Sequence, residues 1–166
     1  MSHVKEFHLM HGIVLTRILR NDSPTLRLVE TDKSDAWAMY VLNDAVIVYI
    51  KYSICSRITK KEEKTVWNFP FQSSELKKIS EKKQTLPVYF ALVCGFPAVN
   101  EAKKMEVCLL EPLEIEKCID INLEKSQTIT VELITRASLR AYGSKNPVTK
   151  LVISRNKLDE WIIPGS

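Results

Sequence analysis

The sequence is poor in glycine and has no long apolar run. Its 166 residues include only 4 glycines, which lie far apart, so there is no glycine-rich loop of the kind that holds a phosphate. No stretch of about 18 consecutive apolar residues occurs, which excludes a membrane-spanning helix. The first dozen residues lack the basic and apolar regions of a signal peptide. We therefore expect a cytoplasmic protein that does not bind membranes.

Cysteine and histidine are too scattered to indicate a metal site or a nucleophilic enzyme. The 4 cysteines form no CxxC pair, and we expect reduced thiols. All 3 histidines fall within the first eleven residues, and no GxSxG motif is present, so a serine or cysteine hydrolase is not indicated. The histidine pair near the start finds no further ligands elsewhere, and no metal site is predicted there.

The apolar pattern predicts an α+β protein. Apolar residues three to four positions apart indicate helices, whereas runs rich in β-branched and aromatic residues indicate strands. Helices are expected over 6–20, 73–84 and 113–120, strands over 25–30, 36–42, 45–53, 66–71, 87–94, 105–111, 128–134, 138–144 and 149–155, and a short amphipathic segment over 156–164. Without a repeat or a long linker, we expect one domain over residues 1–166, with a mixed, mostly antiparallel sheet flanked by about three helices.

Several local features accompany these elements. Ser73 and Ser74 are expected to cap the second helix, and Pro70 favours a strand edge or end. Residues 57–64 are a charged excursion with nothing to bury. The run 87–94 is apolar on both faces, so we expect it to be the most deeply buried strand.

A lysine ends the second strand of a predicted hairpin. Lys51 follows an apolar run, and a two-residue loop at Asn43 and Asp44 would join the two strands. In that register Ala36 lies opposite Lys51, which brings Asp35 close to the lysine. The hairpin therefore predicts that an acid and a lysine meet at one end of the sheet.

This order of a helix and three strands, with acids before a hairpin and a lysine after it, resembles the core of PD-(D/E)XK restriction-endonuclease-like proteins. In that fold an acid and an E-x-K pair bind a divalent cation, and the lysine assists a water in attacking a phosphodiester. The resemblance implies Lys51, Asp35 and Glu30 as candidate catalytic residues. Tyr49 stands where the acid of the E-x-K pair belongs, so the resemblance implies a degenerate scaffold.

Two alternatives to the degenerate scaffold are open from the sequence. A migrated carboxylate would restore a magnesium-dependent nuclease, the one case in which a cofactor is expected, and its candidate donors are Glu6, Glu30, Asp32 and Asp35. A plain hairpin whose lysine extends along apolar surface to solvent explains the same residues without any chemistry.

A second resemblance covers most of the chain. Lys51-Tyr52-Ser53 at a strand end, Trp67-x-Phe69-x-Phe71, and the strand end Leu92-Val93-Cys94-Gly95 are similar to motifs of a group of uncharacterised bacterial proteins. The chain departs from that pattern after Ser53, where Ile54 and Cys55 replace polar and basic residues. The resemblance implies a bacterial source and one intact domain, and it supplies no activity.

The charge is unevenly placed along the chain. The net charge is +4, residues 101–124 hold seven acidic and three basic residues, and residues 136–158 hold six basic residues and no acid. Cations next to an aromatic ring suit a nucleic-acid backbone and a stacked base. The candidate nucleic-acid-binding residues are Arg136, Arg140, Tyr142, Lys145, Lys150, Arg155 and Lys157. The alternative is a solvated sheet edge, where lysines discourage association.

These patterns favour a nucleic-acid-associated bacterial protein, binding DNA or RNA through a degenerate nuclease-like scaffold and not itself an enzyme. One alternative is a protein-interaction subunit that docks through the acidic segment 101–124 or through an apolar edge at Trp67, Phe69 and Phe71. The other alternative is the metal-dependent nuclease. Salt separates the first two classes, because phosphate contacts weaken steeply with salt and an apolar interface does not.

Overall fold

The computed structural model describes residues 6–21, 23–32, 36–55, 57–61, 63–97 and 105–165. For Phe7 and Arg57 it describes the backbone only. It confirms the α+β class. In chain order the elements are α1 (Glu6–Arg20), β1 (Leu26–Thr31), β2 (Trp37–Leu42), β3 (Val46–Ile54), β4 (Arg57–Thr59), β5 (Lys64–Phe71), α2 (Ser73–Lys83), β6 (Val88–Gly95), β7 (Glu106–Leu110), α3 (Pro112–Cys118), β8 (Gln127–Ile134), β9 (Leu139–Gly143), β10 (Asn146–Ile153) and α4 (Lys157–Glu160).

Sheet A is a five-stranded mixed sheet with the order β1-β2-β3-β6-β7. Its first three strands form an antiparallel meander, β6 runs parallel to β3, and β7 runs antiparallel to β6. A parallel pair needs a long crossover, and here β4, β5 and α2 lie within it. Every residue of β6 except Tyr89 is buried, but every residue of β7 is buried as well, so the run 87–94 is deeply buried without being the most buried strand.

Sheet B takes the other strands, in the antiparallel order β10-β9-β8-β5-β4. The sequence predicted one mixed sheet, but strand partners are chosen by contacts between distant segments, which a local pattern does not contain. The described side chains of the charged excursion 57–64 are not buried, as expected, but β4 and the start of β5 form there through backbone pairing. Pro70 lies beyond the reach of β4 on a part of β5 that pairs only with β8, which confirms its edge position.

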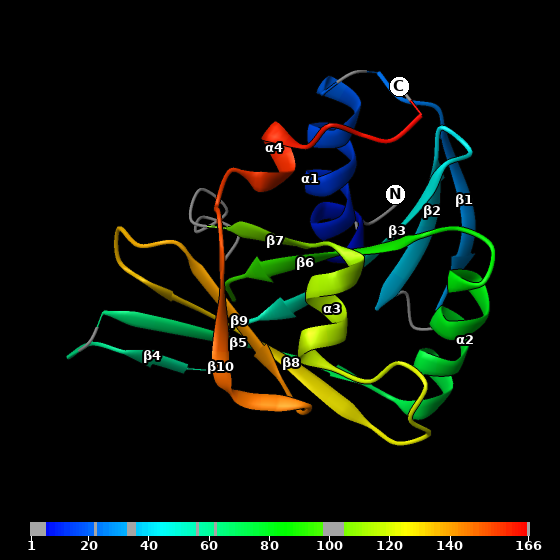
Figure 1. Cartoon of the computed structure of the whole chain (residues 1–166). Coiled ribbons are helices and arrows are strands. Elements are labelled where there is room, and N and C mark those ends of the chain that lie inside the picture. The colour runs from blue at the N-terminus through cyan, green and yellow to red at the C-terminus, as the bar shows by residue number, and fades with distance from the viewer. Residues whose placement is uncertain are drawn as a thin grey trace.

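Two apolar layers lie on the two faces of sheet A (Figure 1). One layer fills the space between sheet A, sheet B, α2 and α3, and includes Tyr49, Phe71 and Phe90, all fully buried. The other packs α1 and α4 against the opposite face of sheet A through Val14, Leu158 and their neighbours. The side chains of β3 therefore alternate between the two layers, and Lys51 points to the layer that contains sheet B.

A fourth helix forms in the segment predicted only as amphipathic. Leu158 in α4 and Trp161 just after it are buried against α1, and Arg17 of α1 binds Asp159 with two hydrogen bonds of 2.8 and 2.9 Å. The last described residues thus pack back onto the first helix. None of the described helices has the length and apolar character to span a membrane.

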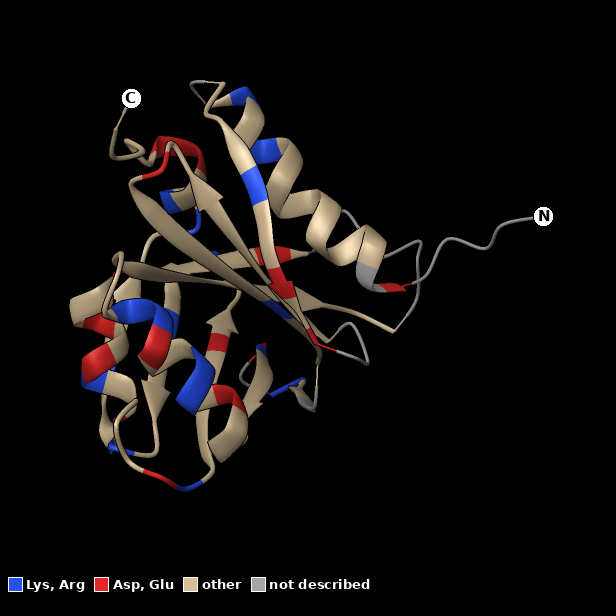
Figure 2. Ribbon diagram, turned by 90° about the vertical axis from the view of Figure 1, so that its right-hand side faces the viewer, with Lys and Arg blue, Asp and Glu red and all other residues tan. Residues whose placement is uncertain are grey.

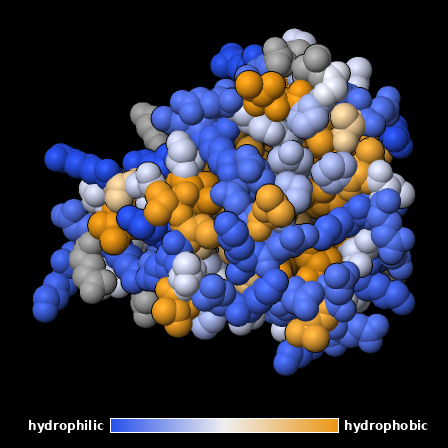
Figure 3. Space-filling model, in the orientation of Figure 1, coloured by the Kyte–Doolittle hydropathy of each residue, from blue (hydrophilic) through white to orange (hydrophobic). Residues whose placement is uncertain are grey.

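Charge and apolar surface are both divided into small areas. Figure 2 shows basic and acidic residues interspersed over the helices. On the face seen in Figure 3, apolar side chains form several separate groups among polar ones. Large apolar side chains that remain well exposed include Leu113, Val148 and Ile162.

Gly143 is required by the close approach of α3 to β9. A Cβ atom at this position would lie 2.2 Å from the backbone carbonyl oxygen of Cys118, whereas a Cβ at Gly12 in α1 would meet nothing within 4 Å. We expect Gly143→Ala to lower the free energy of unfolding by about 1–3 kcal/mol, because the clash is with backbone. Gly12→Ala, the matched control, should raise it by about 0.5–1 kcal/mol through helix propensity. Urea denaturation of both variants measures these changes, and equal effects would contradict the close approach.

The four cysteines form no disulfide bond and lie in unlike surroundings. Cys94, Cys108 and Cys118 are buried, and burial raises the pKa of each thiol, that of Cys118 to about 11. Cys55 is only half-buried. Because the thiolate is the reactive form, we expect a thiol reagent to modify Cys55 alone in the native protein and all four cysteines after unfolding. If the folded Cys55→Ser variant reacted with the reagent as fast as the folded wild-type protein, this assignment would be wrong.

Candidate functional site

The β2–β3 hairpin sets which residue faces Lys51. Asn43 and Asp44 both have positive φ, 52° and 51°, and the amide of Ala45 donates to the Leu42 carbonyl at 2.9 Å. Ala45 is thereby drawn into the loop, which has three residues, and Leu42 pairs with Val46. The predicted register is one residue off.

The shifted register changes the neighbour of the lysine. Trp37, not Ala36, lies opposite Lys51 in the β2–β3 pair. Side chains of directly opposed residues point to the same face, so Trp37 and Lys51 both face the layer between the sheets. Lys51 lies on the central strand of sheet A, as predicted, although β3 continues for three residues beyond it to Ile54.

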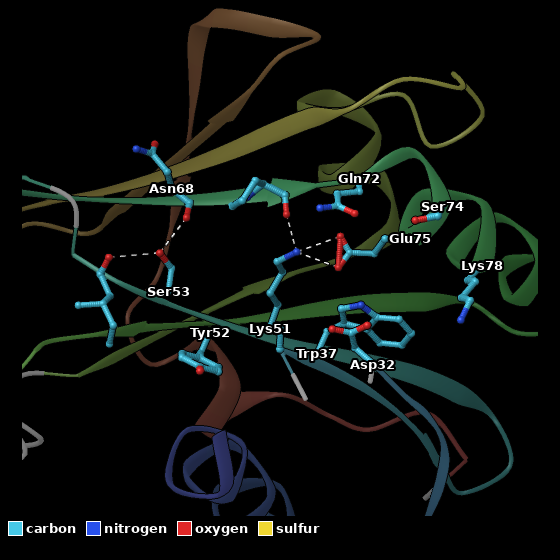
Figure 4. A pocket seen from close by; sticks show the side chains of 13 residues that line it. Asp32, Trp37, Lys51, Tyr52, Ser53, Asn68, Gln72, Ser74, Glu75 and Lys78 are labelled. Carbon is cyan, nitrogen blue, oxygen red and sulfur yellow. Dashed lines mark hydrogen bonds and ion pairs between the residues drawn. The ribbon is translucent and has the colours of Figure 1, made fainter. Parts of the chain in front are cut away.

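Lys51 forms a buried ion pair with a residue of α2. Its ammonium donates to the two carboxylate oxygens of Glu75 at 2.8 and 2.9 Å, and to the carbonyl oxygen of Pro70 (Figure 4). The side chains of Lys51 and Glu75 are only 10% and 7% exposed. The Phe71 ring lies 4.6 Å from the ammonium. An ammonium has three N–H donors, so these contacts use all of them.

Tyr49 joins the same carboxylate. It stands two residues before Lys51, where an E-x-K pair would have its acid, and its hydroxyl donates to Glu75. Sequence reasoning missed Glu75, because it comes from a helix 24 residues along the chain. The feature of the sequence that could have drawn attention to Glu75 was its place in the first turn of a predicted helix. Ser73 and Ser74 do not cap that helix, since Gln72 is the N-cap residue and the serines are its first helical residues.

Burial and nearby negative charge both change the pKa of Lys51 and of Tyr49. The two effects oppose each other for Lys51 and add together for Tyr49. Burial lowers the pKa of Lys51, and the negative charges of Glu75 and Asp32 oppose that change. Burial raises the pKa of Tyr49 well above its usual value, and the same two carboxylates raise it further. Tyr49 therefore keeps its proton as a donor to Glu75.

A pocket of about 610 Å³ opens beside this ion pair. Its lining includes Asp32, just after β1, and a rim of short polar side chains and Lys78. Of the predicted acids, Glu30 binds Lys78 at 2.8 Å and does not contact Lys51, and Asp35 lies outside the described residues. Within the described part of the chain, no group of three histidine, cysteine or acidic side chains could hold a metal ion.

Three of the six cations of the predicted basic stretch are paired with acids in space. Lys150 binds Glu132, Arg155 binds Glu106, and Lys157 binds Glu114, while Lys145 donates to the carbonyl oxygen of Glu116 at 2.7 Å. These acids lie outside the stretch, so its one-signed charge is a property of the sequence order. Arg136 is exposed in the β8–β9 turn, and Arg140 and Tyr142 lie on one face of β9.

Of the two docking surfaces expected for an interaction subunit, the apolar edge is buried, and the acidic segment is partly paired with cations. Trp67, Phe69 and Phe71 are fully buried, because alternate residues of β5 face the layer between the sheets. In the acidic segment, Glu106 is bound to Arg155 and Glu116 to Lys83 at 2.6 Å. Residues 101–104 lie outside the described part of the chain.

The Lys51–Glu75 pair predicts a specific pattern of stability changes. Lys51→Met leaves the Glu75 carboxylate buried without its cation, so we expect a loss of about 3–5 kcal/mol in unfolding free energy. The double variant Lys51→Met/Glu75→Leu should recover most of that loss, because no uncompensated charge remains. Lys78→Met, which breaks an exposed pair with Glu30, should cost at most about 1 kcal/mol. A double-mutant cycle by chemical denaturation tests this, and additive effects of the two core substitutions would refute coupling.

The segments around Lys51, Trp67 and Gly95 contact one another near the pocket. Lys51 contacts the carbonyl of Pro70, Ser53 donates to the carbonyl of Asn68 at 2.7 Å, and the indole of Trp67 donates to the carbonyl of Gly95 at 2.8 Å. Along this part of β5, hydrogen bonds from side chains to backbone carbonyls take the place of pairing with a neighbouring strand. These hydrogen bonds join the two sheets. No family model, curated protein or solved structure matches the chain.

Proposed function

We propose that the protein binds nucleic acid at this pocket, on a nuclease-like scaffold that does not catalyse hydrolysis. One observation carries the proposal: the Lys51–Glu75 pair lies on the third strand of a unit made of a helix and three antiparallel strands, beside an open polar pocket. After this unit, α2 supplies the carboxylate and β6 runs parallel to β3. In open sheets of this kind ligands bind near the carboxyl ends of parallel strands.

The state of the ion pair favours binding over hydrolysis. All three N–H donors of Lys51 are engaged, and Glu75 accepts from both Lys51 and Tyr49. A lysine that assists a water needs a free donor, and a carboxylate that binds a cation needs a free oxygen. Neither group has this freedom while the pair is intact.

The pocket rim offers groups that suit a phosphate. Lys78 keeps 47% of its side chain exposed, and Ser74 and Gln72 add a hydroxyl and an amide. Both of these lie at the start of α2, where unpaired backbone N–H groups and the helix dipole favour an anion. Asn68, which belongs to β5, lines the opposite side of the pocket.

A divalent-metal-dependent nuclease is the second candidate, and one observation favours it. Asp32 and Glu75 line the same pocket as Lys51. The carboxylate of Glu75, which α2 supplies, would then be the migrated metal ligand that the nuclease alternative requires. Magnesium is commonly held by one or two carboxylates together with substrate phosphate. Lys51 would first have to release Glu75.

The nucleic-acid proposal predicts salt-dependent binding that depends on Lys78. Fluorescence anisotropy with labelled DNA and RNA at several salt concentrations should show affinity that falls steeply with salt. Lys78→Gln should reduce the slope of log affinity against log salt by about one, for one lost phosphate contact. Arg20→Gln, at the end of α1 on the other face of sheet A, is the matched control and should leave the slope unchanged.

Three results would change this conclusion. Absence of binding to DNA and RNA at low salt would contradict the proposal. Salt-independent binding would favour an apolar interface. Magnesium-dependent cleavage that disappears in Glu75→Gln would establish the nuclease instead.

A further inference from the structure

Within the described part of the chain, sheet B has one face turned toward sheet A and α3 and another face turned away from them. In β8 and β9, Val131, Leu139 and Ala141 point inward and are buried, and α3 packs on that inner side. Their neighbours Arg140 and Tyr142 point to the other side and are only partly buried. We call this side the outer face of sheet B; it includes the buried Val66 together with Lys64, Asn68, Thr130, Glu132, Arg140, Tyr142, Lys150 and Val152.

A buried acid fixes cations on the outer face. Glu132 is 3% exposed and binds Lys64 at 3.2 Å and Lys150, while Arg140 lies directly opposite it on β9. Burial alone would raise the pKa of Glu132, but the hydrogen bonds from the two lysines lower it, so the carboxylate stays ionised. Two lysines therefore bind one acid, which itself lies beneath the surface, and Arg140 is a third cation on the neighbouring strand. The face presents net positive charge at fixed positions.

An aromatic ring lies among these cations. The Lys150 ammonium is 5.2 Å from the centre of the Tyr142 ring, and 39% of the lysine side chain is exposed. Flat sheet surfaces with an accessible aromatic ring and adjacent cations are suited to single strands, whose unstacked bases can lie on the ring. A duplex keeps its bases stacked inside and offers no such contact.

A row of residues connects this ring to the pocket. Tyr142 pairs with Thr130, and Thr130 pairs with Asn68, to which its hydroxyl donates at 3.0 Å. Asn68 lines the pocket. Two strand spacings separate Tyr142 from Asn68, or about 10 Å. The outer face and the pocket are therefore continuous across β5.

We propose that the outer face of sheet B carries single-stranded nucleic acid toward the pocket, with a base on Tyr142 and the backbone on Arg140 and Lys150. This rests on the proposed function and names its substrate as a single strand. The exposed Val152, at 59%, lies on the same face, so a protein partner is the competing occupant that the experiment must separate.

The experiment compares a short labelled single strand with a hairpin duplex of the same sequence. We expect the wild-type protein to prefer the single strand, and Tyr142→Ala to weaken its binding by about 5- to 100-fold while duplex affinity changes less than about twofold. Tyr142→Phe keeps the ring and should bind like wild type. Arg140→Gln should weaken both and reduce the salt slope by about one. Arg20→Gln, at the end of α1 on the other face of sheet A, is the matched charge control and should have little effect.

The outcomes separate this inference from the proposed function. Duplex binding with no preference for the single strand, or a Tyr142→Ala variant with unchanged affinity, would overturn the inference and leave the proposed function standing. Absence of all nucleic-acid binding would overturn both and leave the outer face to a protein partner. If Tyr142→Ala fails to fold by thermal melting, Arg140→Gln decides, since an unchanged salt slope would refute the phosphate contact.

Discussion

The buried ammonium of Lys51 is the contact on which the rest of the arrangement depends. It joins β3 of sheet A, the carbonyl of Pro70 in sheet B and Glu75 of α2. Transfer of both charges out of water is costly, and only close geometry with every donor satisfied offsets it. That requirement fixes the distance between the two sheets and the position of α2. The pocket lies where these three elements meet.

How far the sequence predicted the fold depends on how local each feature is. The helix α1 and the strand β6 follow from the spacing of apolar residues within one segment, and both were predicted. The division into two sheets was not, because pairing of β5 with β8 joins segments about sixty residues apart. The hairpin shows the limit most sharply: its strands were recognised, yet one extra loop residue at Ala45 changed the residue opposite Lys51.

The candidate site shows the same limit. Lys51 was recognised because a lysine after an apolar run is unusual, whereas Glu75 looked like an ordinary acid on a polar helix. The charge of the basic stretch was overestimated for the converse reason, since Glu106 and Glu132, which neutralise part of it, are distant in sequence or belong to another strand. Charge counted along a chain does not give charge on a surface. Only the paired partners decide which cations remain available.

Among the described residues, the buried carboxylates of Glu75 and Glu132 hold lysines, and the two lysines differ in their exposure. Glu75 holds Lys51, whose side chain is 10% exposed and whose donors are all used inside the protein. Glu132 holds Lys150, whose side chain is 39% exposed beside Tyr142. A carboxylate beneath a partly exposed lysine holds the ammonium in one orientation and leaves it accessible. This lowers the entropy cost of binding an anion. The first pair therefore builds the scaffold, and the second leaves a cation positioned for a ligand.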